Sequence, residues 1–343
     1  MPRSRRQWIS QQAGSFHIIS RTSGAQIMLT DEEKEYFLAL LERFAAGFFV
    51  QIHAFAIMDN HFHILATGLE LEAKKAPEET LINRYRLMYG KSAEPPAGAY
   101  DTNGDLIPDA DGGIARLRER LSSISRFVQE LKQTFSHWYN KRHNREGYLW
   151  SDRFKGILVE NGETQTVCSA YIDLNPMRAK MVEKPEDYRW SSLGLRVRNP
   201  VRARKLLGDV IFESAAATSM QSKAVILQPD SHDPFLAKDE YIANNSSCNR
   251  FEKYREFIYI SGGMERKGKG NISPELIAEV KKYHGKLGIG DGLKYRIKNI
   301  SEGLAIGSHS FISGIQEQLK RKYIRPRAFM KGELLYCTRL LRV

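Results

Sequence analysis

The order of hydrophobic patterns near the N-terminus limits the folds open to this chain more than any other feature. Residues 16–22 have the length and β-branched content of a strand. Thr30 and Glu33 then form a capping box for a helix. One apolar face of that helix is formed by Phe37, Leu40, Leu41 and Phe44. Residues 48–58 and 61–67 predict two strands joined by a tight turn. The predicted order is therefore strand, helix, strand, strand.

Later segments complete a sheet. Residues 153–159 are typical of a fourth strand, and a helix capped by Asn161 or Thr164 follows it. Pro176 is expected to stop that helix, because the residue before a proline avoids the α region. The whole predicts an α+β fold of the ferredoxin-like kind, with an antiparallel β-sheet and helices on one face.

Two segments lie between these strands. Residues 94–113 hold five acids, no bases, three prolines and four glycines, a composition that predicts a surface insertion. Its acids resemble a calcium loop but lack the required glycine and final acid, so we interpret it as a polar loop. Residues 117–138 predict one long amphipathic helix. A coiled-coil homodimer is an alternative, but the pattern barely reaches the length that coiled coils need, which favours a helix laid across the sheet.

Length, charge and cysteine content constrain the rest. A chain of 343 residues exceeds a usual single core, so we expect a domain over residues 1–200 and an accessory, mainly helical region over 205–343. In the second region, helices are expected from Pro274 and over 308–323.

Three distant cysteines fit neither a disulfide framework nor a zinc ribbon. A net charge of +12 points to a polyanionic partner. No apolar run is long enough to cross a membrane and no secretory signal begins the chain, so a cytoplasmic protein is expected.

Two side-chain pairs could carry chemistry. His61 and His63 are two apart on a predicted strand, so both imidazoles lie on one face and could hold a divalent metal. Most such pairs, however, are ordinary polar positions of a half-buried strand. Tyr171 and Asn175 lie one turn apart on a predicted helix, but could equally be a core residue and a helix-end residue. His17 and His53 are interpreted as ordinary strand residues.

These pairs lie in two longer segments, residues 58–63 (MDNHFH) and 171–179 (YIDLNPMRA), and a third segment, residues 188–192 (YRWSS), follows them. Together they strongly resemble the single-tyrosine HUH transposases, and most closely the REP-associated tyrosine transposases. Further similar positions are Phe16-His17 with Arg21, and Trp150 with Arg153-Phe154-Lys155. The resemblance covers about residues 10–195. The acidic insertion departs from compact members of the family, and the C-terminal region lies outside the match.

The resemblance implies a DNA transposase that cleaves and rejoins single-stranded DNA near palindromic hairpins through a 5′-phosphotyrosine intermediate. Tyr171 would be the nucleophile, and His61, His63 and Asn175 would hold Mg²⁺ or Mn²⁺. Such a protein would act in the cytoplasm, on the nucleoid. An ordinary tyrosine has a pKa of ~10 and needs a base or a metal to attack at neutral pH.

A basic segment of the sequence could contact DNA. From Arg116 to Lys155 there are ten Lys or Arg and four acids, interleaved with aromatic residues. This mixture suits a nucleic-acid groove, and equally a solvated helix face with core aromatics behind it. The candidates for phosphate contact are Arg178, Arg153 and Lys155, and those for base stacking are Trp150 and Phe154. Trp190 is expected in the core.

Two other functions compete with this one. A domesticated, non-catalytic DNA hairpin-binding protein would keep the same fold and site. A zinc hydrolase would use the histidine pair differently, but it needs more ligands and usually a strand-helix barrel, neither of which the sequence indicates.

Overall fold

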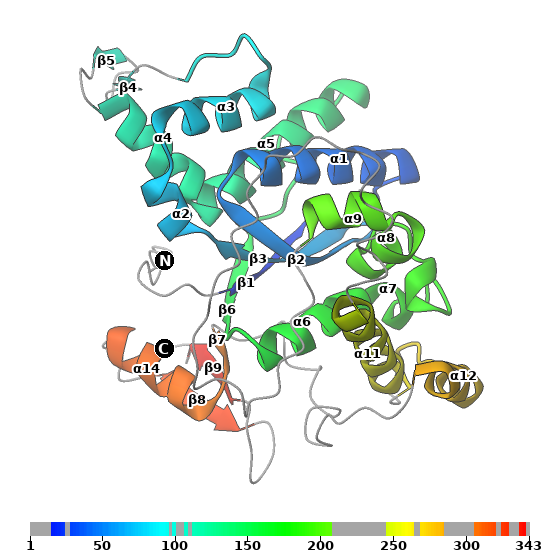
Figure 1. Ribbon diagram of the computed structural model, residues 1–343. Coiled ribbons are helices and arrows are strands. Elements are labelled where there is room, and N and C mark those ends of the chain that lie inside the picture. The colour runs from blue at the N-terminus through cyan, green and yellow to red at the C-terminus, as the bar shows by residue number, and fades with distance from the viewer. Residues whose placement is uncertain are drawn as a thin grey trace.

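A seven-stranded mixed sheet forms the centre of the computed structural model, in the order β2-β3-β1-β6-β7-β9-β8 (Figure 1). Its strands are β1 (Ser15–Arg21), β2 (Val50–Ile57), β3 (His61–Gly68), β6 (Lys155–Val159), β7 (Ala305–Gly307), β8 (Ile324–Ala328) and β9 (Tyr336–Leu340). The structure describes residues 15–24, 28–95, 98–100, 106–108, 112–207, 245–263, 268–284, 305–319, 324–328 and 336–340.

The first four strands pair antiparallel, as the sequence predicts, and the α+β fold class is confirmed. The C-terminal region contains the two expected helices, α12 (Pro274–His284) and α14 (His309–Leu319), and a further helix, α11 (Asn245–Gly262). It also contains β7, β8 and β9, which extend the sheet, with β7 parallel to β6. These strands were not predicted, because β7 has only three residues and shows no readable alternation.

Helices cover both faces of the sheet (Figure 1). α1 (Asp31–Gly47) and α5 (Ile124–Arg142) cover the face to which Phe62 of β3 points, and the Phe37 and Phe62 ring centroids are 4.9 Å apart. α6 (Glu163–Asp173) covers the opposite face, where the Tyr171 ring centroid lies 5.9 Å from that of His63. The prediction of helices on one face is therefore wrong. Side chains alternate along β3, and those on both faces are buried beneath helices.

Shorter elements complete the described chain. They are α2 (Glu70–Lys75), α3 (Glu78–Tyr89), α4 (Gly112–Ser122), α7 (Asn175–Arg178), a 3₁₀ turn (Pro185–Asp187), α8 (Ser192–Arg198), α9 (Pro200–Leu206), and a ribbon of β4 (Gly98–Tyr100) and β5 (Leu106–Pro108). The ribbon lies within the predicted insertion. The acids compared with a calcium loop, Asp101, Asp105 and Asp109 with Asn103, fall outside the described residues.

The capping box of α1 is confirmed. The Thr30 backbone N–H donates to Glu33 Oε2 at 2.6 Å, and the Glu33 N–H donates to Thr30 Oγ1 at 3.4 Å. Phe37, Leu41 and Phe44 are fully buried on its apolar face. The box fixes the start of the helix, and the apolar face fixes which side meets the sheet.

The long helix predicted over residues 117–138 is instead two helices, α4 and α5. They meet at Ser123, whose Oγ accepts a hydrogen bond at 3.3 Å from the Arg126 N–H and so starts a new helix. Apolar spacing alone did not reveal this break. Leu121, Val128 and Phe135 are fully buried within the chain, so their stripe is used internally. The homodimer stays a prediction.

The start and the end of α6 also differ from expectation. Its N-cap is Gly162, which has φ 81°, a left-handed conformation that favours glycine. Asn161 does not cap the helix, because its Oδ1 accepts from Ser15 Oγ at 2.8 Å. The helix ends at Asp173, before Pro176, and the short helix α7 then begins with the proline in its first turn.

The C-terminal region contacts the first part of the chain. The Tyr254 hydroxyl of α11 donates to Asp173 Oδ2 at 2.7 Å, and Arg178 donates to the backbone oxygens of Ser261 and Gly270. The division into two units near residue 205 stays a prediction.

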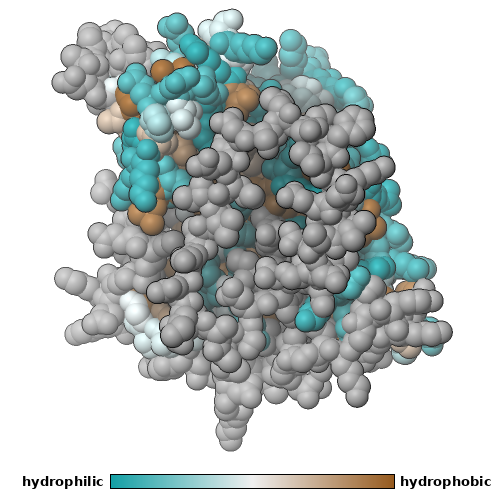
Figure 2. Space-filling model, viewed as in Figure 1, coloured by the Kyte–Doolittle hydropathy of each residue, from teal (hydrophilic) through white to brown (hydrophobic). Residues whose placement is uncertain are grey.

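The described surface is mostly polar. No helix among the described residues is long and apolar enough to span a bilayer. Exposed large hydrophobic side chains, such as Leu71 and Leu87, are scattered, and the visible surface over α3 and α4 is mainly hydrophilic (Figure 2).

Candidate active site

The histidine pair lies at the beginning of β3, on the face covered by α6. The His61 and His63 ring centroids are 5.1 Å apart. His61 Nδ1 is 2.7 Å from Asn60 Oδ1, and His63 Nδ1 is 2.9 Å from His17 Nε2. An amide oxygen only accepts, so Nδ1 of His61 carries the proton and Nε2 presents a lone pair. Each ring is therefore held through Nδ1, the arrangement that orients metal-binding histidines elsewhere.

His17 is a third member of this group, which sequence reasoning treated as an ordinary strand residue. It is fully buried on β1, and its ring centroid lies 5.1 Å from that of His63 and 5.8 Å from that of Tyr171. The register of β1 against β3 pairs His17 with Leu65, which puts His17 diagonally across from His63 on the same face. The strand pattern predicts its face but not this pairing, which depends on register.

Burial keeps both candidate ligands neutral. It lowers the pKa of His61 to about 4, with Arg21 and Lys269 adding to the shift and Asp59 opposing it. Burial also holds the pKa of His63 well below its usual value, with the neighbouring His17 and His61 rings contributing. Neutral imidazole is the form that binds a metal. The electrostatics therefore fit a metal site at neutral pH.

Tyr171 and Asn175 occupy neighbouring helices but keep the spacing of one turn. Tyr171 is half-buried on α6, with its ring edge-on to that of His63. Asn175 opens α7, and its Nδ2 donates to the Tyr171 carbonyl at 2.9 Å. That bond does not involve Asn175 Oδ1, the atom expected to ligate. The structure thus brings the Tyr171 ring to His63 and links Asn175 to the backbone of Tyr171.

The donor set fits a hard or borderline divalent ion better than a thiolate-selective one. It offers two neutral imidazoles and one amide oxygen, ligands that Mn²⁺ accepts and Mg²⁺ accepts less readily. In the part of the chain that the structure describes, no three His, Cys, Asp or Glu side chains group to hold a metal.

The predicted stacking residues lie in the core. Trp150 and Phe154 are buried, and the Trp150 ring packs edge-on against Phe37 and Phe62. Trp150 Nε1 donates to the Lys132 carbonyl at 3.2 Å. Neither ring is placed to stack on a base. Their spacing beside basic residues resembled a nucleic-acid surface, but both residues precede β6 and their rings pack inward.

The predicted phosphate contacts divide into two kinds. Arg178 is buried, and its guanidinium donates to the Ser261 carbonyl at 2.7 Å and the Gly270 carbonyl at 2.8 Å, so it joins α7 to the C-terminal region. Arg153 and Lys155 are exposed. Lys155 pairs with Ile19 in the β1–β6 register, which puts it on the same sheet face as His63.

Several cations of the basic segment are engaged within the chain. Arg118 donates to the backbone oxygens of Ala73 and Ala76. Arg120 forms an ion pair with Glu130, and Arg142 pairs with Glu32. Lys132 is buried and donates to the Asp152 carbonyl. Much of this segment therefore stabilises the helical layer, and its charge cannot all be assigned to DNA.

Asp173 was missed by sequence reasoning, although it lies two residues after Tyr171. This buried carboxylate accepts from Ser192 Oγ at 2.5 Å, the Leu193 N–H at 2.9 Å and the Tyr254 hydroxyl at 2.7 Å. Burial raises its pKa, while these hydrogen bonds oppose the shift. A buried acid held by three donors fixes the end of α6, and hence Tyr171, against two other segments.

The segment Tyr188 to Ser192 attaches to the outer strand. The Tyr188 hydroxyl donates to the Ile57 carbonyl at 2.7 Å, and Ser192 Oγ accepts from the Phe55 N–H at 3.1 Å. Trp190 is buried, as expected. This segment thus supports the site through β2 and Asp173.

No protein-family model matches this chain, and no curated protein matches it. A solved structure of a REP-associated tyrosine transposase bound to a REP hairpin is similar, with 16% sequence identity and a TM-score of 0.37. The match covers 65% of this chain and all of that one. At this sequence identity and TM-score, the similarity assigns no function to this chain.

Proposed function

We propose that this chain is a metal-dependent tyrosine transposase that cleaves and rejoins single-stranded DNA near palindromic hairpins. The observation that carries the proposal is the position of Tyr171, whose ring lies edge-on to the buried, neutral imidazole of His63 and to the ring of His17. The His61 imidazole, whose pKa burial also lowers, lies beside that of His63. The sequence resemblance supports the same assignment of residues.

The reaction needs one nucleophile and a polarised phosphate. A divalent ion held by His61, His63 and Asn175 would polarise the scissile phosphate and offset negative charge in the transition state. The Tyr171 hydroxyl loses its proton, and its oxygen bonds to phosphorus while the bond from phosphorus to the 3′-oxygen breaks. The 3′-oxygen takes up a proton and leaves as a hydroxyl. Attack by another 3′-hydroxyl on the phosphotyrosine reverses these steps and joins the strands.

Other residues of the chain position the reacting groups. His17 and Asn60 hold the two imidazoles, while Asp173 holds the end of α6. Lys155, on the same face as His63, is our candidate for a phosphate contact, and Arg153 lies beside it. No nucleotide triphosphate is required, because the phosphotyrosine conserves the energy of the broken phosphodiester.

The test is to incubate the chain with Mn²⁺ and single-stranded oligonucleotides carrying palindromic hairpins from beside its gene. We expect a protein-DNA adduct that survives denaturation and maps to Tyr171. Tyr171→Phe should abolish the adduct and leave hairpin binding nearly unchanged, since only a hydroxyl is lost. Tight binding of the wild-type chain without an adduct would favour the non-catalytic hairpin-binding protein. An adduct in Tyr171→Phe would reassign the nucleophile.

A further inference from the structure

A cleft of about 680 Å³ lies between Tyr89 at the end of α3, α4 from Gly113 to Arg120, and α5 from Arg126 to His137. Its volume falls within the ~300–1,000 Å³ usual for ligand pockets. None of His61, His63, Tyr171 or Asn175 lines it, and α5 covers the face of the sheet opposite the histidine pair. The cleft is therefore separate from the candidate active site.

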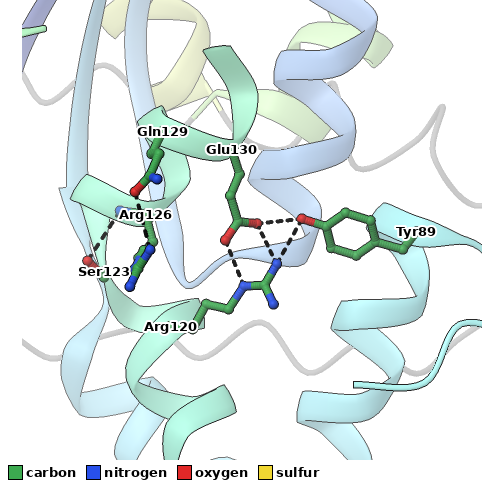
Figure 3. Close-up of polar contacts among 6 residues, drawn as sticks. All are labelled: Tyr89, Arg120, Ser123, Arg126, Gln129 and Glu130. Atoms are coloured by element: carbon green, nitrogen blue, oxygen red, sulfur yellow. Dashed lines mark hydrogen bonds and ion pairs between the residues drawn. The ribbon is translucent and has the colours of Figure 1, made fainter. Parts of the chain in front are cut away.

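One wall of the cleft is a fixed polar triad (Figure 3). Arg120 donates from Nε to Glu130 Oε1 at 2.7 Å and from Nη2 to Oε2 at 3.0 Å. The Tyr89 hydroxyl donates to Glu130 Oε2 at 2.5 Å and accepts from Arg120 Nη2 at 3.0 Å. The bidentate pair balances the charge of Glu130. The lining also contains the exposed Glu119, and its three arginines outnumber its two acids.

The other wall is a polar stripe along α5, formed by Arg126, Gln129, Gln133 and His137. These residues are three or four apart, so they share one helix face. The stripe runs for roughly 16 Å at ~1.5 Å per residue. Arg126 Nη1 donates to Gln129 Oε1 at 3.3 Å, and Figure 3 shows both side chains beside Ser123.

The lining has the chemistry of a nucleic-acid contact. Arginines such as Arg126 and Arg116 bind phosphate oxygens, and amides such as Gln129 and Gln133 bind base edges. The Tyr89 ring packs against Tyr85 and Phe44, and its exposed part, 41% of the residue, could contact a base. Leu117 is the single aliphatic residue among the described lining, and its side chain is buried.

We propose that this cleft binds a few nucleotides of single-stranded DNA, away from the phosphate that Tyr171 attacks. The choice of DNA rests on the proposed function, whereas the location rests on the cleft itself. A contact of this kind would hold the substrate on the helical layer while the opposite face of the sheet carries out the chemistry.

Salt-dependent binding tests the proposal. The full chain carrying Tyr171→Phe, which forms no adduct, is titrated with a labelled single-stranded hairpin oligonucleotide at several salt concentrations, and binding is followed by fluorescence anisotropy. Adding Arg126→Gln should weaken binding about tenfold. It should also reduce the slope of log K against log salt by about 0.7, the value for one single-strand phosphate contact. Gln133→Leu should weaken binding with no change in slope, because it removes an uncharged contact.

Lys141→Gln is the matched control, because Lys141 is an exposed cation on the same helix that does not line the cleft. Its affinity and slope should stay unchanged. An unchanged slope in Arg126→Gln, or an equal loss in Lys141→Gln, would overturn the proposal. Arg126-dependent binding, together with no adduct when the chain with Tyr171 intact is tested for cleavage, would keep the cleft and reject the proposed reaction. A Tyr171 adduct together with a salt slope that does not depend on Arg126 would keep the proposed reaction and reject the cleft.

Discussion

The two faces of strand β3 are built from opposite chemistry. Phe62 and its neighbours on one face meet the rings of Phe37 and Trp150. On the other face, His63 meets the ring of His17 across a hydrogen bond, and α6 covers both. Both faces are buried, but the first gains stability from apolar contact, while the second buries polar groups that have a cost unless each finds a partner.

The polar face meets this cost with hydrogen bonds among its own side chains. Ser15 Oγ lies 2.8 Å from Thr67 Oγ1 and receives a bond from Gln165 at 2.9 Å. His53 Nε2 lies 2.7 Å from the same Thr67 oxygen. A buried row of this kind adds less stability than the aromatic face, so the difference between the faces points to chemistry as the reason for the row.

The largest expected effects come from one substitution on each face of β3: the first should mainly reduce stability, and the second should mainly reduce cleavage activity. Phe37→Ala should lower the free energy of unfolding by about 3–5 kcal/mol, because it removes a fully buried ring from close packing. His63→Ala should cost about 1–3 kcal/mol, the range for leaving the His17 nitrogen without its partner. Urea unfolding measures both.

Cleavage of the hairpin oligonucleotide with Mn²⁺ should show the opposite order. We expect His63→Ala to remove it and Phe37→Ala to retain it at temperatures where the chain stays folded. Full cleavage by His63→Ala would contradict the metal site, and an equal stability loss in the two variants would remove the contrast between the faces.

Acid should weaken the polar face selectively. Burial, with Arg196 adding to it, lowers the pKa of His53 from 6.5 to about 4 in the folded chain. Between these values the unfolded state binds more protons than the folded state. The contribution of His53 to the free energy of unfolding is therefore complete above pH 6.5. It declines as the pH falls toward 4, by up to about 1.4 kcal/mol per pH unit.

His53→Gln should make this decline shallower, as measured by urea unfolding at pH 7.5, 5.5 and 4.5. The remaining slope comes from other groups, including His61 and His63, whose pKa values burial also lowers. If His53→Gln and the wild-type chain lost stability in parallel, His53 would not titrate with the low pKa expected from its burial.

Local patterns predicted those features that local forces decide. The α1 capping box, the antiparallel pairing of the first four strands and the shared face of His61 and His63 follow from spacing and alternation. The break at Ser123 was missed, because the apolar spacing continues through it and only a side-chain cap interrupts the helix.

The tertiary environment decided what the sequence could not. Trp150 and Arg178 have the residue types of a DNA surface, but the fold buries both, one in the aromatic core and one against backbone carbonyls. Conversely, His17 and Asp173 gained site-supporting positions from strand register and from the distant Tyr254, neither of which a single sequence displays. Strand β7 depends on a partner far away along the chain.

The smallest expected effect concerns His17, the group that joins the polar row to the histidine pair. If its Nε2 accepts the His63 Nδ1 proton, His17→Leu should lower Mn²⁺ affinity on the order of 10-fold to 100-fold without removing a ligand. His17→Gln should recover part of this loss, because an amide oxygen can accept the same proton. Titrating the DNA-free chain with Mn²⁺ alone, by calorimetry or by the loss of the free-ion paramagnetic resonance signal, measures the affinity apart from cleavage. His53→Leu is the matched control, since His53 lies in the same polar row but bonds to Thr67. Equal Mn²⁺ affinity in His17→Leu and wild type would show that His17 has only a structural role. An equal loss of affinity in His53→Leu would show that the effect comes from disturbing the polar face in general.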